Sequence, residues 1–493
     1  MPSIRTITGL TRPVANRPAD YLKVSAFAAG VLLVEAILAR GAAAPQLSKF
    51  ILLFLAVVGI AFVFRFPLAT ALALLALSDF LFHPTFFALS VGALDVRPHE
   101  VALGALLLVA LVRPESRTWG GVTGAALAIF LLAIAVSGTL AFVGDAAPLT
   151  DVFNWARPLG LLTFFYVVVR LFPNPRQRGL LLVGAAVLAA ATGVVALMIS
   201  LGAGFGDSLQ EAGGNTVREQ EGAGSIDRVR LAGLSLGYAL FWYAAVKLVS
   251  ARGLRRLGWA AVLGGISLDI VVSFNRNMWF GLAIGFGLMT AMGGALVRSR
   301  LVAALAVGVA GIALFVVFGS SAANNQVVTP VVQRGATILN PKEVAGESSF
   351  EEREQETKVA WRTARENPLF GVGAGAPFGI LTTHQIGPHS FERTPRLFLH
   401  NQYLYLLLIA GIPGLLAFLV FLGVPLARSF RRTPADPAIA ACGVAIAMIM
   451  ISSVVAIYFT VEDMTAVLGL LTGVLVADAE GRAPLGEDSG LLT

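Results

Sequence analysis

The chain has few charged residues, little histidine and almost no cysteine. Asp, Glu, Lys and Arg together make up 13% of its 493 residues, whereas a soluble domain carries about 25%. Hydrophobic residues make up 57%. This imbalance excludes an ordinary soluble globular protein. The lone Cys442 also excludes an intramolecular disulfide and a cysteine-held metal cluster.

The excess of positive charge does not indicate nucleic acid. The chain has 36 Lys and Arg against 29 Asp and Glu, an imbalance that can accompany nucleic-acid binding. Here the arginines gather in short gaps between apolar runs, where they orient a membrane protein. We therefore expect membrane lipids around the chain and no nucleic-acid partner.

Apolar runs fill the chain almost from end to end, and they predict an all-α polytopic membrane protein. A helix needs about 20 mostly apolar residues to cross the hydrocarbon, which gives roughly fourteen spans. The third and fourth are the weakest, because Asp79, His83 and Pro84 interrupt them. The spans lie near 21–40, 48–66, 67–88, 99–113, 119–143, 153–172, 179–201, 230–250, 256–274, 276–297, 301–319, 400–427, 437–460 and 463–478.

Basic residues occupy alternate gaps between these spans, and the intervening short gaps hold very few. By the positive-inside rule, the basic gaps are cytoplasmic. Both tails, 1–20 and 479–493, then lie in the cytoplasm, and the N-terminal tail is not expected to be a cleaved signal. The basic gaps hold Arg5, Arg12, Arg17 and Lys23; Arg65; Arg113 and Arg117; Arg176 and Arg178; Arg252, Arg255 and Arg256; Arg298 and Arg300; and Arg428, Arg431 and Arg432.

Two longer polar segments fall on the opposite side of the membrane. The first, 203–229, interrupts a bundle of about 11 helices over 21–319, by the same 20-residue rule. The second, 320–399, precedes the C-terminal transmembrane helices over 400–478 and is too long for a simple connection. It contains a predicted helix that starts with a capping box at Ser349 and ends before Pro368.

Within that helix, Glu354 and Lys358 are spaced to form an ion pair across one turn. The glycine string 371–375 follows it. The string lacks the Lys-Ser/Thr pair of a phosphate-binding loop and the strand–helix context of a dinucleotide site. We interpret it as a flexible turn.

Three basic residues lie at the outer ends of predicted spans: Arg230, Arg276 and His400. An arginine there often extends its charge to lipid headgroups, although the positive-inside bias disfavours arginine on this side. Its planar fork of donors also suits phosphate, so two arginines at one cavity would suit a diphosphate. His400 is either an ordinary interfacial histidine or a general base.

Asp269 lies within a predicted span, seven residues before Arg276, a spacing that places both on one helical face. An intramembrane carboxylate is costly and usually has a partner inside the protein. Structural pairing with an arginine is the simpler interpretation. No His, Asp or Glu cluster has metal-ligand spacing, so we expect no protein-held metal.

Three short motifs carry a family resemblance. The sequence Pro-Leu-Phe-Gly-Val-Gly at 368–373 is followed by His-Asn-Gln-Tyr-Leu at 400–404 and Gly-Ile-Pro-Gly-Leu at 411–415. In order, spacing and position, they resemble the O-antigen ligase and O-antigen polymerase superfamily of bacterial envelope glycosyltransferases. Asn-Arg-Asn-Met-Trp at 275–279 resembles that family's Arg-Gly-Ala-Trp segment, with Asn and Met replacing Gly and Ala. The resemblance covers about 225–425.

The resemblance also implies roles for particular residues. Arg230 resembles the arginine of the family's Arg-x-x-Gly motif, with Arg228 as a rival. Arg230 and Arg276 would bind the diphosphate of an undecaprenyl-diphosphate-linked oligosaccharide, and His400 would activate the acceptor hydroxyl. Asp269 and Asn401 are supporting candidates. The family implies no metal and no cofactor.

The resemblance places the protein in the bacterial inner membrane with a periplasmic active site. The acceptor is either a growing glycan, for a polymerase of O-antigen or exopolysaccharide repeat units, or lipid A core, for an O-antigen ligase. We favour the polymerase, because family ligases usually have about twelve spans and polymerases about fourteen, counted at about 20 residues per span. A lipid-linked glycan flippase is the alternative from another class, but the internal repeats typical of transporters are absent.

Overall fold

The computed structural model describes residues 62–78, 89–91, 94–200, 234–273, 275–292, 298–303, 348–379, 381–387, 390–395, 397–431 and 436–481. The chain divides into two units, Met1–Ala69 and Thr70–Thr493. Of the first unit, residues 62–69 are described. They form a helical turn at 62–65, where the Phe62 and Phe66 rings lie 4.9 Å apart, and the start of α3.

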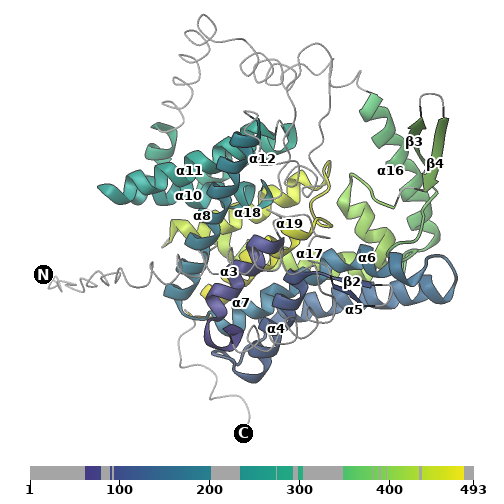
Figure 1. Ribbon diagram of the computed structural model, residues 1–493, viewed down its shortest axis with the longest axis horizontal. Coiled ribbons are helices and arrows are strands. Elements are labelled where there is room, and N and C mark those ends of the chain that lie inside the picture. The colour runs from purple at the N-terminus through teal and green to yellow at the C-terminus, as the bar shows by residue number, and fades with distance from the viewer. Residues whose placement is uncertain are drawn as a thin grey trace, which may run out of the picture. The chain divides into compact units, whose positions relative to one another are not determined.

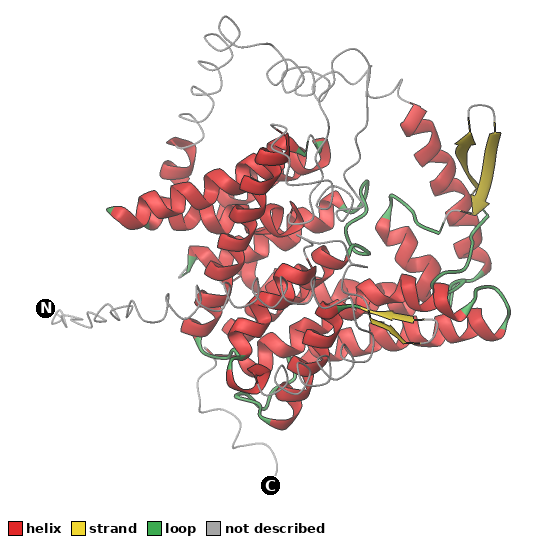
Figure 2. Ribbon diagram, viewed as in Figure 1, coloured by secondary structure: helices red, strands yellow, loops and turns green. Residues whose placement is uncertain are grey.

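The described residues are mainly helical (Figures 1 and 2). Each predicted span that falls within them overlaps a helix or, at 153–172, a run of helices joined by a 3₁₀ turn, but the span predicted at 437–460 is helical only to Ser452. The helices are α3 Pro67–Ser78, α4 Pro98–Val112, α5 Gly121–Val143, α6 Leu149–Gly160, η1 Leu161–Thr163, α7 Phe164–Leu171, α8 Pro175–Ser200, α10 Leu234–Ser250, α11 Leu254–Val272, α12 Arg276–Met292, α16 Ser348–Glu366, α17 Gln402–Arg431, α18 Pro437–Ser452 and α19 Glu462–Gly481.

Five of these helical stretches are long and apolar enough to cross a membrane: Gly121–Val143, Leu149–Leu171, Pro175–Ala196, Gln402–Arg431 and Glu462–Gly481. Further apolar helices in the described part of the chain, α10 and α18 among them, are shorter. The predicted count of fourteen spans is not confirmed by these lengths. The predicted first span lies outside the described residues, as do most of the second and of 301–319.

The structure also contains two short antiparallel hairpins, which the all-α prediction did not include. In the first, β1 Leu89–Val91 pairs with β2 Leu94–Val96, with Leu89 opposite Val96. In the second, β3 Leu381–Gly387 pairs with β4 Ser390–Pro395, and the register shifts between Gln385 and Gly387. This second hairpin belongs to the predicted 320–399 loop, together with α16 (Figure 1).

Aromatic side chains join the central helices. Within the second unit, α17 packs along α5, and α19 packs against α7 and α18. The Phe418 ring of α17 lies 5.0 Å from Phe130 of α5 and 4.7 Å from Phe459, and Phe421 lies 5.5 Å from Phe165. All five rings are fully buried. They fix α17, the helix that follows His400, in the middle of the bundle.

Small residues bring α8 and α11 into direct backbone contact. A Cβ at Gly193 would lie 1.9 Å from the carbonyl oxygen of Gly265, and a Cβ at Gly265 would lie 2.6 Å from that of Ala190. Glycine is therefore needed at both positions. Close approach through small residues is the usual way in which helices associate in a membrane.

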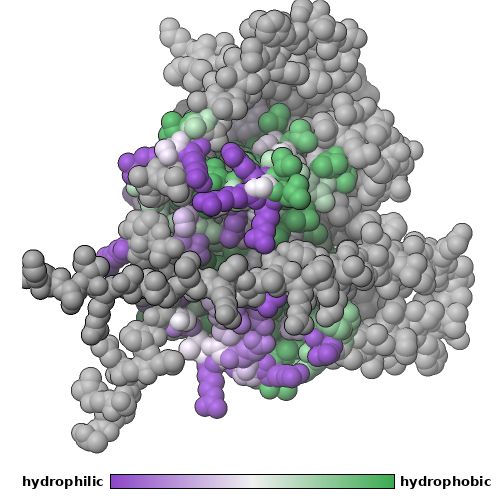
Figure 3. Space-filling model, turned by 90° about the vertical axis from the view of Figure 1, so that its left-hand side faces the viewer, coloured by the Kyte–Doolittle hydropathy of each residue, from purple (hydrophilic) through white to green (hydrophobic). Residues whose placement is uncertain are grey.

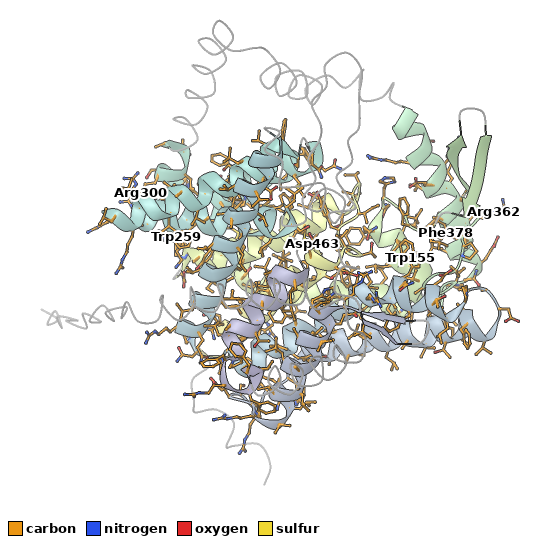
Figure 4. The ribbon with its side chains drawn as sticks, in the orientation of Figure 1. Trp155, Trp259, Arg300, Arg362, Phe378 and Asp463 are labelled. Atoms are coloured by element: carbon orange, nitrogen blue, oxygen red, sulfur yellow. The ribbon has the colours of Figure 1, made fainter. Side chains whose placement is uncertain are left out.

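Helix ends at the predicted basic gaps contact one another in two places. The backbone amides of Glu115 and Ser116 donate to the Arg170 carbonyl, and Arg178 pairs with Asp478 at 3.4 Å. Separately, Arg300 Nη1 donates to the Val249 carbonyl at 2.5 Å. Figure 4 labels Arg300, and Figure 3 views the molecule from the left-hand side of Figure 1, where hydrophilic patches lie beside hydrophobic ones. The assignment of the basic gaps to the cytoplasm stays a prediction.

Candidate functional site

His400 lies immediately before α17, and the next two residues fix the start of that helix. Asn401 is the N-cap, because its Oδ1 accepts the Leu404 amide at 3.1 Å. Gln402 is fully buried. Its backbone amide donates to the Ser453 carbonyl at 3.0 Å, and its side-chain Oε1 accepts a hydrogen bond from the Thr460 hydroxyl at 3.1 Å. The motif His-Asn-Gln therefore presents His400 on a capped and anchored helix start.

The His400 ring faces a carboxylate from α16. Glu356 Oε2 lies 3.0 Å from His400 Nδ1, and Oε1 lies 3.3 Å from the same nitrogen. Glu356 also accepts the His400 backbone amide, at 3.5 Å. The Glu356 side chain is 4% exposed and the His400 side chain 28%. The imidazole is thus accessible from outside, whereas its acidic partner is covered.

Sequence reasoning missed Glu356, although a signal for it exists. Glu356, Ala360 and Ala364 recur every four residues along α16, and all three are buried. They therefore form the inner stripe of an otherwise polar helix. A carboxylate in such a stripe needs a partner to offset its loss of water. The pattern alone does not identify His400, 44 residues further along the chain, as the partner of Glu356.

The predicted ion pair is confirmed, and it lies on the exposed face of α16. Glu354 Oε1 lies 2.6 Å from Lys358 Nζ, and this hydrogen bond lowers the pKa of Glu354. The helix ends at Glu366, before Pro368, as predicted, and it begins at Ser348. Ser349 is therefore one residue inside the helix rather than its cap.

The glycine string is a packed turn rather than the flexible one that was predicted. Gly371, Gly373 and Gly375 have φ values of 69°, 96° and 78°, in the region that glycine alone adopts readily. A Cβ at Gly371 would lie 2.0 Å from the Leu408 carbonyl of α17, and one at Gly375 would lie 2.6 Å from the Asp151 backbone of α6. Both positions therefore exclude any side chain.

This turn replaces the hydrogen bonds that α17 loses at a kink. Gly411 has φ 65° and ψ −173°, which breaks the helix. The Ile412 amide bonds to the Pro368 carbonyl at 2.9 Å instead of to Leu408. The freed Leu408 carbonyl accepts the Val372 amide at 2.6 Å. The motifs at 368–373 and 411–415 are therefore two halves of one joint between the loop and α17.

A neighbouring residue completes the joint. Pro413 has no amide hydrogen to donate to the Ile409 carbonyl, and the Ser137 hydroxyl of α5 donates there instead. Every backbone group that the kink frees at 408, 409 and 412 thus has a partner, which buried backbone requires.

Arg276 is the first residue of α12, and the residues on either side of it hold the start of that helix. Asn275 caps the helix: its carbonyl accepts the Met278 amide at 3.1 Å, and its Oδ1 accepts the Asn277 amide at 3.1 Å. Trp279 Nε1 donates to the Ile270 carbonyl of α11 at 3.1 Å. Arg228 and Arg230 lie outside the described residues.

Asp269 is fully buried in α11. The prediction that it shares a helical face with Arg276 is wrong, because α11 ends at Val272 and Arg276 begins the next helix. Among the described residues, neither carboxylate oxygen of Asp269 has a hydrogen-bond partner. A Cβ at Gly237 of α10 would lie 3.8 Å from Asp269 Oδ2. The pairing of Asp269 with an arginine stays a prediction, because the side chains of Arg228, Arg230 and Arg276 lie outside the described residues.

A second group of charges, which sequence reasoning also missed, joins the starts of α4 and α19 to the end of α6. Arg97 pairs with Glu462, and His99 Nε2 lies 3.4 Å from the same carboxylate. Arg157 Nε lies 2.8 Å from Glu100. Each arginine has an acidic partner, so the pairs offset the cost of burying charge where three helices meet.

Among the described residues, no three His, Cys, Asp or Glu side chains lie close enough to hold a metal ion. The apolar helices and the docked loop define the class: a helical membrane protein in which a loop packs against a kinked helix.

The O-antigen ligase family model matches residues 255–419. The match runs from α11 through Arg276, α16 and His400 to the kinked part of α17, and it confirms the resemblance seen in the motifs. This match over residues 255–419 supports the O-antigen ligase and O-antigen polymerase superfamily, which is a glycosyltransferase-type enzyme family. No curated protein matches the chain.

Proposed function

We propose that the protein transfers a glycan from an undecaprenyl-diphosphate-linked donor to a sugar hydroxyl at the periplasmic face of the bacterial inner membrane. The observation that carries this proposal is the pair of His400 and the buried Glu356, within 3.0 Å of each other at a capped helix start. It lies inside the segment that matches the O-antigen ligase family.

In the proposed reaction, His400 Nε2 accepts the proton of the acceptor hydroxyl. The acceptor oxygen attacks the anomeric carbon of the donor and forms the glycosidic bond. The bond from that carbon to the diphosphate breaks, and undecaprenyl diphosphate leaves with the bonding electrons. The proton held by His400 then passes to solvent or to the departing diphosphate.

Arg276 and Arg230 would bind the diphosphate. Arg276 stands at the N-terminus of α12, where a helix is electropositive and a cation is disfavoured. An anion bound at this point would relieve that repulsion and interact with both the guanidinium and the positive end of the helix dipole. Arg228 remains a rival to Arg230.

We propose a growing glycan as the acceptor, which makes the protein a polymerase of O-antigen or exopolysaccharide repeat units. Transfer to lipid A core is the second candidate, and the description of the matching family, O-antigen ligase, favours it. A flippase would move the same donor without making a bond.

The test is formation of a glycosidic bond by the purified protein. It is supplied with lipid-linked repeat units, and the products are separated by length and analysed by mass spectrometry. Longer lipid-linked glycans support a polymerase, and transfer to added lipid A core supports a ligase. Activity should survive EDTA if the reaction needs no metal. Donor binding with no new bond under either condition contradicts a transferase.

A further inference from the structure

We propose that Glu356 is a positioning residue for His400, which fixes the tautomer and the direction of the imidazole ring. This inference rests on the proposed function. A ring nitrogen that faces an ionised carboxylate carries its proton as a donor. Because Nδ1 faces Glu356 at 3.0 Å, the neutral ring keeps its unprotonated nitrogen at Nε2, the atom that accepts the substrate proton.

The carboxylate holds the backbone as well as the ring. The His400 amide points to the same Oε2 atom, at 3.5 Å. On another side, the Phe398 ring meets the imidazole edge to face, with ring centres 6.0 Å apart. These contacts restrict the ring at the point where the chain enters α17. After proton uptake, the buried carboxylate also stabilises the imidazolium that forms.

The pair forms only when α16 is docked, because the two residues come from different elements. Ala360 and Ala364, both buried, continue the stripe of α16 that Glu356 begins. Beyond the end of α16, the hydrogen bonds from Val372 to Leu408 and from Ile412 to Pro368 fasten the turn to α17. The joint at the kink thus holds Glu356 opposite His400.

Glu356 could instead have a purely structural role and only hold α16 in place. The two roles predict different effects of substitution. A tether acts whatever residue stands at 400 and lowers stability when it is lost. A positioning residue acts only through His400. The two roles are separated by combining substitutions, because residues that act as one unit have non-additive effects.

Glu356→Gln keeps the shape of the side chain and removes its charge. In turnover by purified protein, we expect kcat to fall at least about tenfold, by analogy with partners that orient a catalytic histidine. Donor KM and the melting temperature should stay near the parent values. In a His400→Ala background, Glu356→Gln should cause no further loss. Glu354→Gln, two residues away on the exposed face of α16, is the matched control and should retain full activity.

A second readout needs no substrate. NMR of ¹⁵N-histidine-labelled protein distinguishes a protonated Nδ1 from a protonated Nε2. The parent His400 should show the proton on Nδ1, and Glu356→Gln should shift the population towards the other tautomer. An unchanged tautomer, full activity of Glu356→Gln, or an equal loss in both backgrounds overturns the inference. If the parent protein forms no glycosidic bond, the proposed function fails, and the NMR result still decides whether Glu356 orients His400.

Discussion

At the scale of single residues, His400 differs from the other loop histidine whose backbone the structure describes. His384 lies on β3, opposite Glu392, away from any helix start. Positioned proton transfer is worth about 10²–10⁴-fold in rate. We therefore expect His400→Ala to lower turnover by that factor while donor binding is kept, and His384→Ala to remain active. Equal losses in both variants would indicate that the substitutions disturb loop folding instead.

A substitution at Arg276 tests whether donor binding needs the planar guanidinium group. Lysine keeps the charge but cannot make the bidentate contact. Loss of one preorganised donor costs about 2–4 kcal/mol of transition-state stabilisation, so Arg276→Lys should be badly impaired although the protein is made and inserted. Arg230→Lys should behave in the same way. Turnover near that of the parent in Arg276→Lys would contradict the proposed role. If only Arg228 variants lose activity, Arg228 is the donor ligand in place of Arg230.

The candidate residues were predictable from the sequence to different degrees. His400 and Arg276 stand in short motifs whose order is visible along the chain. Asn401 was singled out only as a supporting residue, and its role as the cap of α17 emerges from the structure. Glu356 could not be assigned, because its meaning depends on how α16 docks. The arginine partner predicted for Asp269 stays a prediction, because the side chain of Arg276, which begins the next helix, lies outside the described residues.

At the scale of elements, the joint between the glycine turn and α17 requires glycine at position 411. A Cβ there would lie 2.0 Å from the Leu369 carbonyl, and φ is 65°. Strain of this kind costs on the order of 1–3 kcal/mol. Gly411→Ala should therefore lower the melting temperature and reduce turnover, because the joint also places Glu356. Gly423→Ala, on the same helix with no atom within 4 Å of the added Cβ, should be tolerated. Equal behaviour of the two variants would show that the joint contributes nothing.

Helices in the described residues were predictable because long apolar runs leave the backbone no other way to satisfy its hydrogen bonds in lipid. The kink was not, although Gly411 and Pro413 mark it. Its conformation depends on amides supplied by Val372 and on a carbonyl supplied by Pro368, which no local pattern reveals. The hairpins at 89–96 and 381–395 were also missed, since short strands lack a long periodic signal.

At the scale of the whole molecule, the orientation predicted from the basic gaps can be tested directly. Single cysteines at 210, 254 and 340, in a Cys442→Ala background, are exposed to a membrane-impermeant thiol reagent in intact spheroplasts. Leu254 is 85% exposed at the start of α11, so the reagent reaches this site wherever it has access. We expect labelling at 210 and 340 and none at 254 until the membrane is opened. Labelling at 254 in intact spheroplasts would reverse the predicted topology.

The choice between polymerase and ligase also belongs to this scale, because both reactions would use His400, Arg276 and Arg230. The span count that favours a polymerase is not settled by the described helices, so the products must decide. Deleting the gene leaves different intermediates in the two cases. Loss of a polymerase leaves single repeat units, either on the lipid carrier or transferred to their acceptor. Loss of a ligase leaves long polymer on the carrier and bare core on the surface. We expect single repeats, measured by electrophoresis and mass spectrometry of the lipid-linked fraction. Long carrier-linked chains would identify lipid A core as the acceptor, while the superfamily assignment from residues 255–419 would stand.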